Sequence, residues 1–149
     1  MNLRLPVAAV ALGRPMPFVH QIRVRYGECD MQKVVFNAHY MAYCDDAIDT
    51  WFRSELTPNN TSFESLGFDF MLKSATITWH APLRFGETAD LRCSVARFGN
   101  ASFDVSVAGS ATGDQRFDAT ITYVSVTPGT TTPTRVPELV RERLGGVDQ

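Results

Sequence analysis

The stretch YGECDMQKVVFNAHYMAYCDDA, residues 26–47, combines an acidic loop, a pair of valines and the beginning of a helix. Apolar residues recur at three- and four-residue spacing from Tyr40 to Trp51, which is typical of an amphipathic helix. We expect this helix to span residues 38–55, with Asn37 as its N-cap. Such a helix must bury its apolar face, so the rest of the chain has to supply a surface that covers it.

Strands are expected on both sides of this helix. Residues 18–26 alternate β-branched or aromatic side chains with other types, which favours a half-buried strand. Four more strands are expected after the helix, where apolar and polar residues alternate around residues 77–79, 89–95, 103–107 and 117–123. The segments between these strands are short and rich in turn formers, so we expect successive strands to be antiparallel neighbours.

The order of the expected elements predicts an α+β fold, in which a mostly antiparallel sheet of five to six strands wraps around one long helix. A single sheet leaves its edge strands open, and pairing across a two-fold axis is a common way to cover one. We therefore expect a homodimer or a homotetramer. The folded domain is expected at residues 18–144, with a short last helix at 137–144, a flexible leader at 1–17 and a flexible tail at 145–149.

Composition argues against several classes of function. The 149 residues carry 14 Lys and Arg against 16 Asp and Glu, so the chain lacks the basic excess typical of nucleic-acid binding. The apolar run Val7–Leu12 is too short for a membrane span. Three widely spaced cysteines favour neither a disulfide framework nor a zinc site. We expect a cytoplasmic protein that binds no nucleic acid, membrane or metal.

The residues after the first expected strand carry a more specific signal. Asp30 is followed by Val34, Val35 and Tyr40, and this motif resembles the signature of the 4-hydroxybenzoyl-CoA thioesterase family of hotdog-fold proteins. The order and spacing of elements over residues 18–144 are similar to that family as well. The resemblance implies a hotdog fold and hydrolysis of an acyl-CoA, or a related pantetheine thioester, to free acid and thiol without a cofactor.

The same resemblance implies roles for individual residues. Asp30 would act as a general base on water or as a nucleophile, and the backbone N–H of Asn37 would polarise the thioester carbonyl. A helix start can hold an oxyanion because its first N–H groups have no partners within the helix. Tyr26 matches a tyrosine near the site of bacterial acyl-CoA thioesterases, and Val35 and Tyr40 are expected to contact the substrate.

The nucleotide end of CoA is expected at a turn between two later strands. The resemblance points to residues 97–102, where Arg97, Asn100 and Ser102 would meet phosphate, together with residues from across a subunit interface. The central helix and the facing subunit would form the acyl pocket. Its preference for aromatic or aliphatic groups is expected to depend on large side chains at Trp51, Phe52, Phe63, Phe68 and Phe70.

Two positions depart from the family pattern. Lys33 stands where many relatives have glycine, a position that can demand a backbone conformation that lysine tolerates poorly. Asn37 stands where the bacterial branch commonly has histidine, and an amide cannot act as a general base at neutral pH. This departure shifts the chemistry to Asp30. A hydratase or dehydratase of the same fold, and a non-catalytic acyl-thioester binding protein, are the alternatives.

Other reactive side chains are weaker candidates. Glu28 would share a face with Asp30 in an extended loop and is a competing carboxylate. Cys29 adjoins Asp30, and a neighbouring carboxylate raises the pKa of a thiol rather than lowering it. His39 and His80 are expected to be structural.

Overall fold

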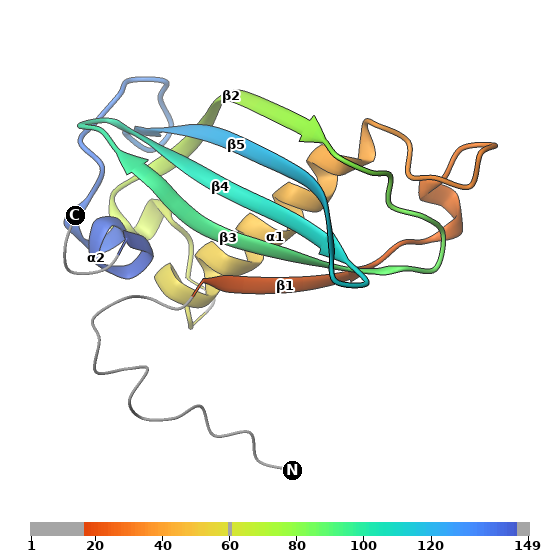
Figure 1. Ribbon diagram of the computed structural model, residues 1–149. Helices are drawn as coiled ribbons and strands as arrows, with labels where there is room; N and C mark the ends of the chain where they lie inside the picture. Colours follow the sequence, from red (N-terminus) through yellow and green to blue (C-terminus); the bar gives the residue numbers. More distant parts are fainter. Residues whose placement is uncertain (1–16, 60, 146–149) are drawn as a thin grey trace, which may run out of the picture.

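The structure is a computed structural model that describes residues 17–59 and 61–145. Five antiparallel strands form one sheet in the order β1-β3-β4-β5-β2, and the long helix lies along one face of it (Figure 1). The α+β prediction is therefore confirmed. The elements are β1 (Phe18–Arg23), η2 (Tyr26–Glu28), α1 (His39–Leu56), η3 (Glu64–Leu66), β2 (Asp69–Trp79), β3 (Thr88–Phe98), β4 (Ser102–Ala111), β5 (Asp114–Val126) and α2 (Glu138–Gly145).

The core lies between α1 and the concave face of the sheet. Every second residue of β4 is buried, and β5 largely follows the same alternation, because successive side chains of a strand point to opposite faces. The buried face of α1 is aromatic and aliphatic, as its periodicity predicted. The helix side of this core consists of Tyr40, Tyr43, Cys44, Ala47, Ile48, Trp51, Phe52 and Leu56.

The start of α1 differs from the prediction. Ala38, and not Asn37, occupies the N-cap position, and no side chain among the described residues caps the helix. A backbone turn supplies the acceptors for the first N–H groups of α1. The His39 N–H donates to the Phe36 carbonyl at 2.9 Å and the Tyr40 N–H to the Asn37 carbonyl at 3.4 Å. The predicted Asn37 cap is therefore wrong, because backbone carbonyls take the N–H groups that a capping side chain would have bound.

Sheet order also differs from the simplest expectation. β2 and β3 follow each other in the chain but are not neighbours, because β2 pairs with β5 while β3 lies between β1 and β4. The connection between β2 and β3 thus crosses the end of the sheet. β2 also begins at Asp69, well before the alternation that predicted it. Most of this edge strand is exposed on both faces, so little alternation marks its first half.

The elements at the two ends of the described chain differ slightly from the predicted ones. β1 ends at Arg23 and not at Tyr26, because the chain turns into η2. The last helix, α2, forms within one residue of the predicted range. The expected leader and tail lie outside the described residues apart from Pro17 and Gly145. None of the helices in the described chain is long and apolar enough to cross a membrane.

Candidate functional site

Asp30 lies in a small hairpin between η2 and α1, which we call the Asp30 hairpin (residues 29–35). The Asp30 N–H donates to the Val34 carbonyl at 2.9 Å, and the Lys33 N–H donates to the Asp30 carbonyl at 3.0 Å. Lys33 has a φ of 63°, the left-handed conformation that a three-residue hairpin loop requires and that glycine adopts most easily. The lysine therefore occupies a glycine-type position without changing the hairpin.

The Asp30 carboxylate is exposed to solvent. Its Oδ1 accepts a hydrogen bond from the Gln32 N–H at 2.8 Å, which orients the side chain, while Oδ2 has no partner among residues 17–59 and 61–145. A carboxylate with one fixed and one open oxygen can accept a proton or attack an electrophile. It borders a cavity of about 700 Å³, here called the Asp30 cavity, whose other walls are Tyr26, Gly27, Cys29, Met31, Lys33 and Phe85.

Aromatic side chains line the Asp30 cavity. Tyr26 is 82% exposed, and its ring meets the Phe85 ring edge-on at 5.9 Å between centroids. Met31 beside them is fully exposed. Gathered large apolar side chains in contact with solvent typically mark a ligand or partner surface. Tyr26 and Asp30 thus line the same cavity.

Asn37 lies at a second cavity, the helix-start cavity, of about 250 Å³. Val35 and Tyr40 are among its walls, so three of the expected site residues come together here. Within the described part of the chain, the backbone N–H groups of Asn37 and Ala38 have no acceptor, so they are open to a ligand oxygen. The remaining walls are Val34, Trp79, His80, Ala81 and Pro82.

The two cavities share no wall residue but are connected by the second strand of the Asp30 hairpin. The connection between β2 and β3 supports this strand, because the Val35 N–H donates to the Leu83 carbonyl at 2.8 Å and the Phe85 N–H to the Lys33 carbonyl at 3.2 Å. The buried Tyr40 hydroxyl accepts from the Leu83 N–H at 3.0 Å. Backbone bonds to the β2–β3 connection therefore help to hold the second strand of the hairpin beside the helix start.

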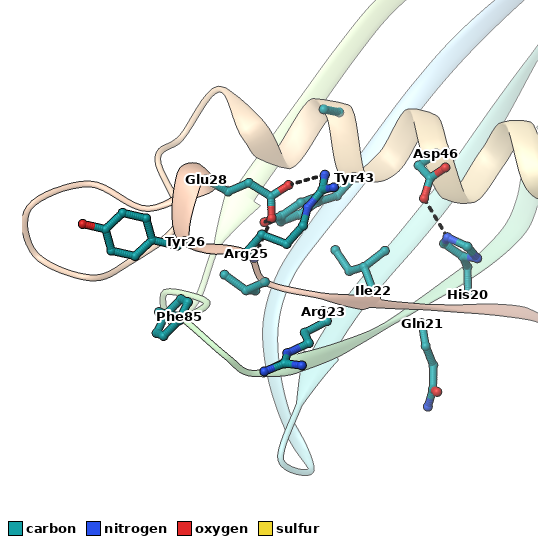
Figure 2. A pocket seen from close by; sticks show the side chains of 12 residues that line it. His20, Gln21, Ile22, Arg23, Arg25, Tyr26, Glu28, Tyr43, Asp46 and Phe85 are labelled. Atoms are coloured by element: carbon teal, nitrogen blue, oxygen red, sulfur yellow. Dashed lines mark hydrogen bonds and ion pairs between the residues drawn. The ribbon is translucent and has the colours of Figure 1, made fainter.

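Glu28 has surroundings unlike those of Asp30. Its side chain is only 13% exposed and faces a groove of about 880 Å³ between β1 and α1 (Figure 2). It accepts hydrogen bonds from the Arg25 N–H at 2.8 Å, the Arg25 guanidinium at 3.1 Å and the Tyr43 hydroxyl at 2.9 Å. Burial raises the pKa of this carboxyl, but the bonds from Arg25 and Tyr43 outweigh it and hold the pKa below its ordinary value. Glu28 is therefore a poor general base.

His80 borders the helix-start cavity, but strand alternation turns its ring away from α1. Trp79 precedes it, pairs with Phe117 and contacts the Tyr40 ring at 5.7 Å, so Trp79 faces the helix and its neighbour faces the opposite side of the sheet. On that side, His80 Nε2 lies 2.7 Å from the Asp118 carboxylate. Among the described residues, no histidine lines the Asp30 cavity.

The expected CoA-binding turn lies at the far end of the sheet. The Asp30 hairpin follows the end of β1, which pairs with the beginning of β3, whereas Arg97, Asn100 and Ser102 lie where β3 turns into β4, next to α2 (Figure 1). One chain therefore does not bring these three residues to Asp30. This separation follows from the long strands between them.

The polar side chains of that turn bind one another. Arg97 donates to Asp104 at 3.0 Å and to the Ser102 hydroxyl at 3.3 Å. Arg135 donates to the Asn100 side-chain oxygen at 3.1 Å. A phosphate bound here would have to compete with these contacts. Residues 17–59 and 61–145 also contain no group of three His, Cys, Asp or Glu side chains placed to hold a metal ion.

Known proteins resemble the chain over most of its length. Residues 24–144 match the model of the Thioesterase-like superfamily. A 1,4-dihydroxy-2-naphthoyl-CoA thioesterase from Synechocystis has a TM-score of 0.76 and 19% identity, covering 90% of this chain and 99% of that chain. A thioesterase-superfamily structure from Jannaschia sp. CCS1 has a TM-score of 0.80 and 22% identity, covering 88% and 93%.

A hypothetical protein from Staphylococcus aureus, solved in complex with CoA, is also similar in structure. Its TM-score is 0.77 at 14% identity, covering 86% of this chain and 81% of that chain. At these identities the likeness establishes the fold, which is the hotdog fold with its sheet curved around a central helix.

Proposed function

The chain belongs to the thioesterase-like superfamily, and we propose that it hydrolyses an acyl-CoA, or a related pantetheine thioester, to the free acid and the thiol. Superfamily membership supports thioester hydrolysis in general. The observation that carries the finer proposal is the open Asp30 carboxylate, oriented by Gln32 at the edge of a cavity of about 700 Å³. A short strand links it to unbound N–H groups at the start of a long helix.

Asp30 supplies the reacting carboxylate in one of two ways. As a general base it takes a proton from water while the water oxygen attacks the thioester carbon. As a nucleophile it attacks that carbon itself, and water then hydrolyses the mixed anhydride. In both routes the C–S bond breaks, the thiolate leaves and takes up a proton, and the acid is released.

The helix start supplies the oxyanion site. Attack places a negative charge on the thioester oxygen, and the N–H groups of Asn37 and Ala38 lie at the positive end of α1. One donor of this kind is worth about 2.7–4 kcal/mol in the transition state. No histidine reaches Asp30 within the described chain, which weighs against the hydratase or dehydratase alternative.

We also propose that two chains pair through β2. This edge strand has 11 residues, and its only charged side chains are Asp69 and Lys73, so little opposes edge-to-edge pairing. Leu72 on it is 54% exposed. An antiparallel two-fold pairing would place the beginning of one β2 beside the end of the other, next to Trp79 and the helix-start cavity. The partner would then complete the wall of that cavity.

A thiol-release assay on a panel of acyl-CoA and acyl-carrier-protein thioesters tests the proposed function. Asp30→Asn removes the charge but keeps the shape, and we expect it to lower kcat by about 10²–10⁴-fold. Asp49→Asn is the matched control, because Asp49 is an exposed helix carboxylate whose one partner among the described residues is Arg53.

Full activity in Asp30→Asn would overturn the mechanism. Tight binding of acyl-CoA with no turnover across the whole panel would instead support the binding-protein alternative. Sedimentation of the wild type beside a Leu72→Lys variant tests the β2 pairing, since a charge on the open edge should shift the protein to monomer.

A further inference from the structure

Glu28 connects the Asp30 hairpin to α1 through both its backbone and its side chain. Its carbonyl accepts from the Phe36 N–H at 2.9 Å, which fixes the second strand of the hairpin just before the helix. Its carboxylate accepts from the hydroxyl of Tyr43 at 2.9 Å, and Tyr43 lies in the second turn of α1. One residue thus holds both the hairpin and the helix.

The partners of the Glu28 carboxylate are themselves well fixed. Tyr43 is 6% exposed, and a buried hydroxyl needs a hydrogen-bond partner. Burial and then the bond to Glu28 raise the pKa of Tyr43, so its hydroxyl stays a donor at any pH near neutral. Arg25 closes the cluster from the other side (Figure 2), with its backbone N–H and its guanidinium on the same carboxylate.

We infer that Glu28, held by Tyr43 and Arg25, is a positioning residue that sets the place of the Asp30 carboxylate relative to the N–H groups at the start of α1. This inference rests on the proposed function. Asp30 comes two residues after Glu28, and its own hydrogen bonds are confined to the hairpin. Without the bond to Tyr43, the hairpin would keep its backbone hydrogen bonds to the β2–β3 connection and the bond between Glu28 and Phe36, but it would lose the side-chain bond that links it to α1.

Substitutions of Glu28 separate positioning from direct chemistry. Glu28→Gln keeps the length and planar shape of the side chain, so its oxygen at the Oε1 position can still accept from both the Arg25 N–H and the Tyr43 hydroxyl, and only the bond to the exposed Arg25 guanidinium is lost. Glu28→Ala removes every one of these contacts. If Glu28 is a positioning residue, Glu28→Gln should keep the activity that Glu28→Ala loses. If Glu28 were a general base, both variants should lose activity to the same extent.

The kinetic experiment compares Glu28→Gln, Glu28→Ala, Tyr43→Phe and the double variant Glu28→Ala/Tyr43→Phe. Because a misplacement of about 1 Å can cost on the order of 100-fold in rate, we expect kcat to fall about 10–100-fold in Glu28→Ala, with a much smaller change in KM. Tyr43→Phe should lose several-fold, Glu28→Gln should stay near wild type, and the double variant should be no worse than Glu28→Ala. Thr50→Val is the control, since it removes a hydroxyl of α1 that donates to the Asp46 carbonyl at 2.7 Å and keeps the shape of the side chain.

Hydrogen exchange of backbone amides measures the hairpin without any turnover. Glu28→Ala should speed exchange of the Asp30, Lys33 and Phe36 amides by about tenfold or more, while β4 amides keep wild-type rates. Unchanged exchange in the hairpin, or equal kcat in Glu28→Gln and Glu28→Ala, would overturn the inference. If the hairpin amides respond as expected but the wild type hydrolyses no thioester, the proposed function fails while the structural connection stands.

Discussion

The two ends of the sheet satisfy their polar groups in opposite ways. At the α2 end, Arg141 donates to the carbonyls of Gly99 at 2.6 Å, Asn100 at 3.2 Å and Val136 at 3.1 Å, and Arg97 is held by Asp104. Arg97, Arg135 and Arg141 are thus bound by other groups of the protein. This end is stabilised by its own contacts.

The hairpin end leaves polar groups and aromatic surface open. Asp30 has one unbound carboxylate oxygen, the Asn37 N–H has no acceptor in the described chain, and Lys33 is held at a positive φ. Tyr26 and Phe85 expose their rings. Unbound groups and local strain are typical of a site that binds a ligand. Substitutions of Asp30 or of the open N–H groups at this end should therefore change activity, and those at the α2 end should change stability.

After that of Asp30→Asn, the largest effect is expected at the start of α1. Asn37→Pro removes the N–H proposed to bind the oxyanion, and proline suits the second position of the turn closed by the His39 and Phe36 bond. We expect kcat to fall about 10²–10³-fold with little loss of stability. Asn37→Ala keeps the amide and should stay within a few-fold of wild type. Steady-state kinetics of the two variants measure this. An equal loss of kcat in both would exclude the backbone N–H of residue 37 as the oxyanion donor.

At the α2 end, Arg141→Ala should lower stability but not activity. The change removes three hydrogen bonds to carbonyls and the contact of the guanidinium with the Phe98 ring at 5.5 Å. We expect the free energy of unfolding to fall by about 2–3 kcal/mol, while kcat of the folded enzyme stays the same. Urea unfolding together with initial rates measures both, and a loss of kcat without loss of stability would contradict the contrast between the two ends.

Acid should weaken both ends through carboxylates with lowered pKa values. Hydrogen bonds from Arg97 and Thr122 lower the pKa of Asp104 despite its partial burial, and the pKa of Glu28 is lowered as well. A folded-state pKa below the unfolded one adds stability above the unfolded pKa, and this is lost as pH falls through the folded pKa. Unfolding free energies should therefore drop from about pH 5 downward. Asp104→Asn should flatten that slope, and an unchanged slope would contradict the assignment.

The smallest effect is expected at Lys33. Lys33→Gly relieves the left-handed strain but adds backbone freedom to the unfolded chain, so we expect a net gain of about 0.5–1 kcal/mol. Lys33→Ala should give no such gain, because alanine has the same backbone restriction. Thermal unfolding of the two variants checks this, and kcat should be unaltered in both since the hairpin keeps its shape.

Local pattern predicted the parts of the fold that local physics controls. The three- and four-residue spacing from Tyr40 to Trp51 located α1 to within one residue at each end, and alternation located β3, β4 and β5. The edge strand β2 was only half recognised, because a strand exposed on both faces has no apolar side to reveal it. The cap at Asn37 was predicted wrongly because side-chain propensity says nothing of the competing backbone turn.

The amino-acid sequence by itself determined the class of fold, the Asp30 motif and the odd position of Lys33, because these depend on residues close together in the chain. Only the tertiary structure decided the sheet order, the bond between Tyr43 and Glu28 fifteen positions apart, and the distance of Arg97 from Asp30. These depend on which surfaces pack together. Packing depends on contacts between residues far apart in the chain, so a local sequence pattern does not predict it.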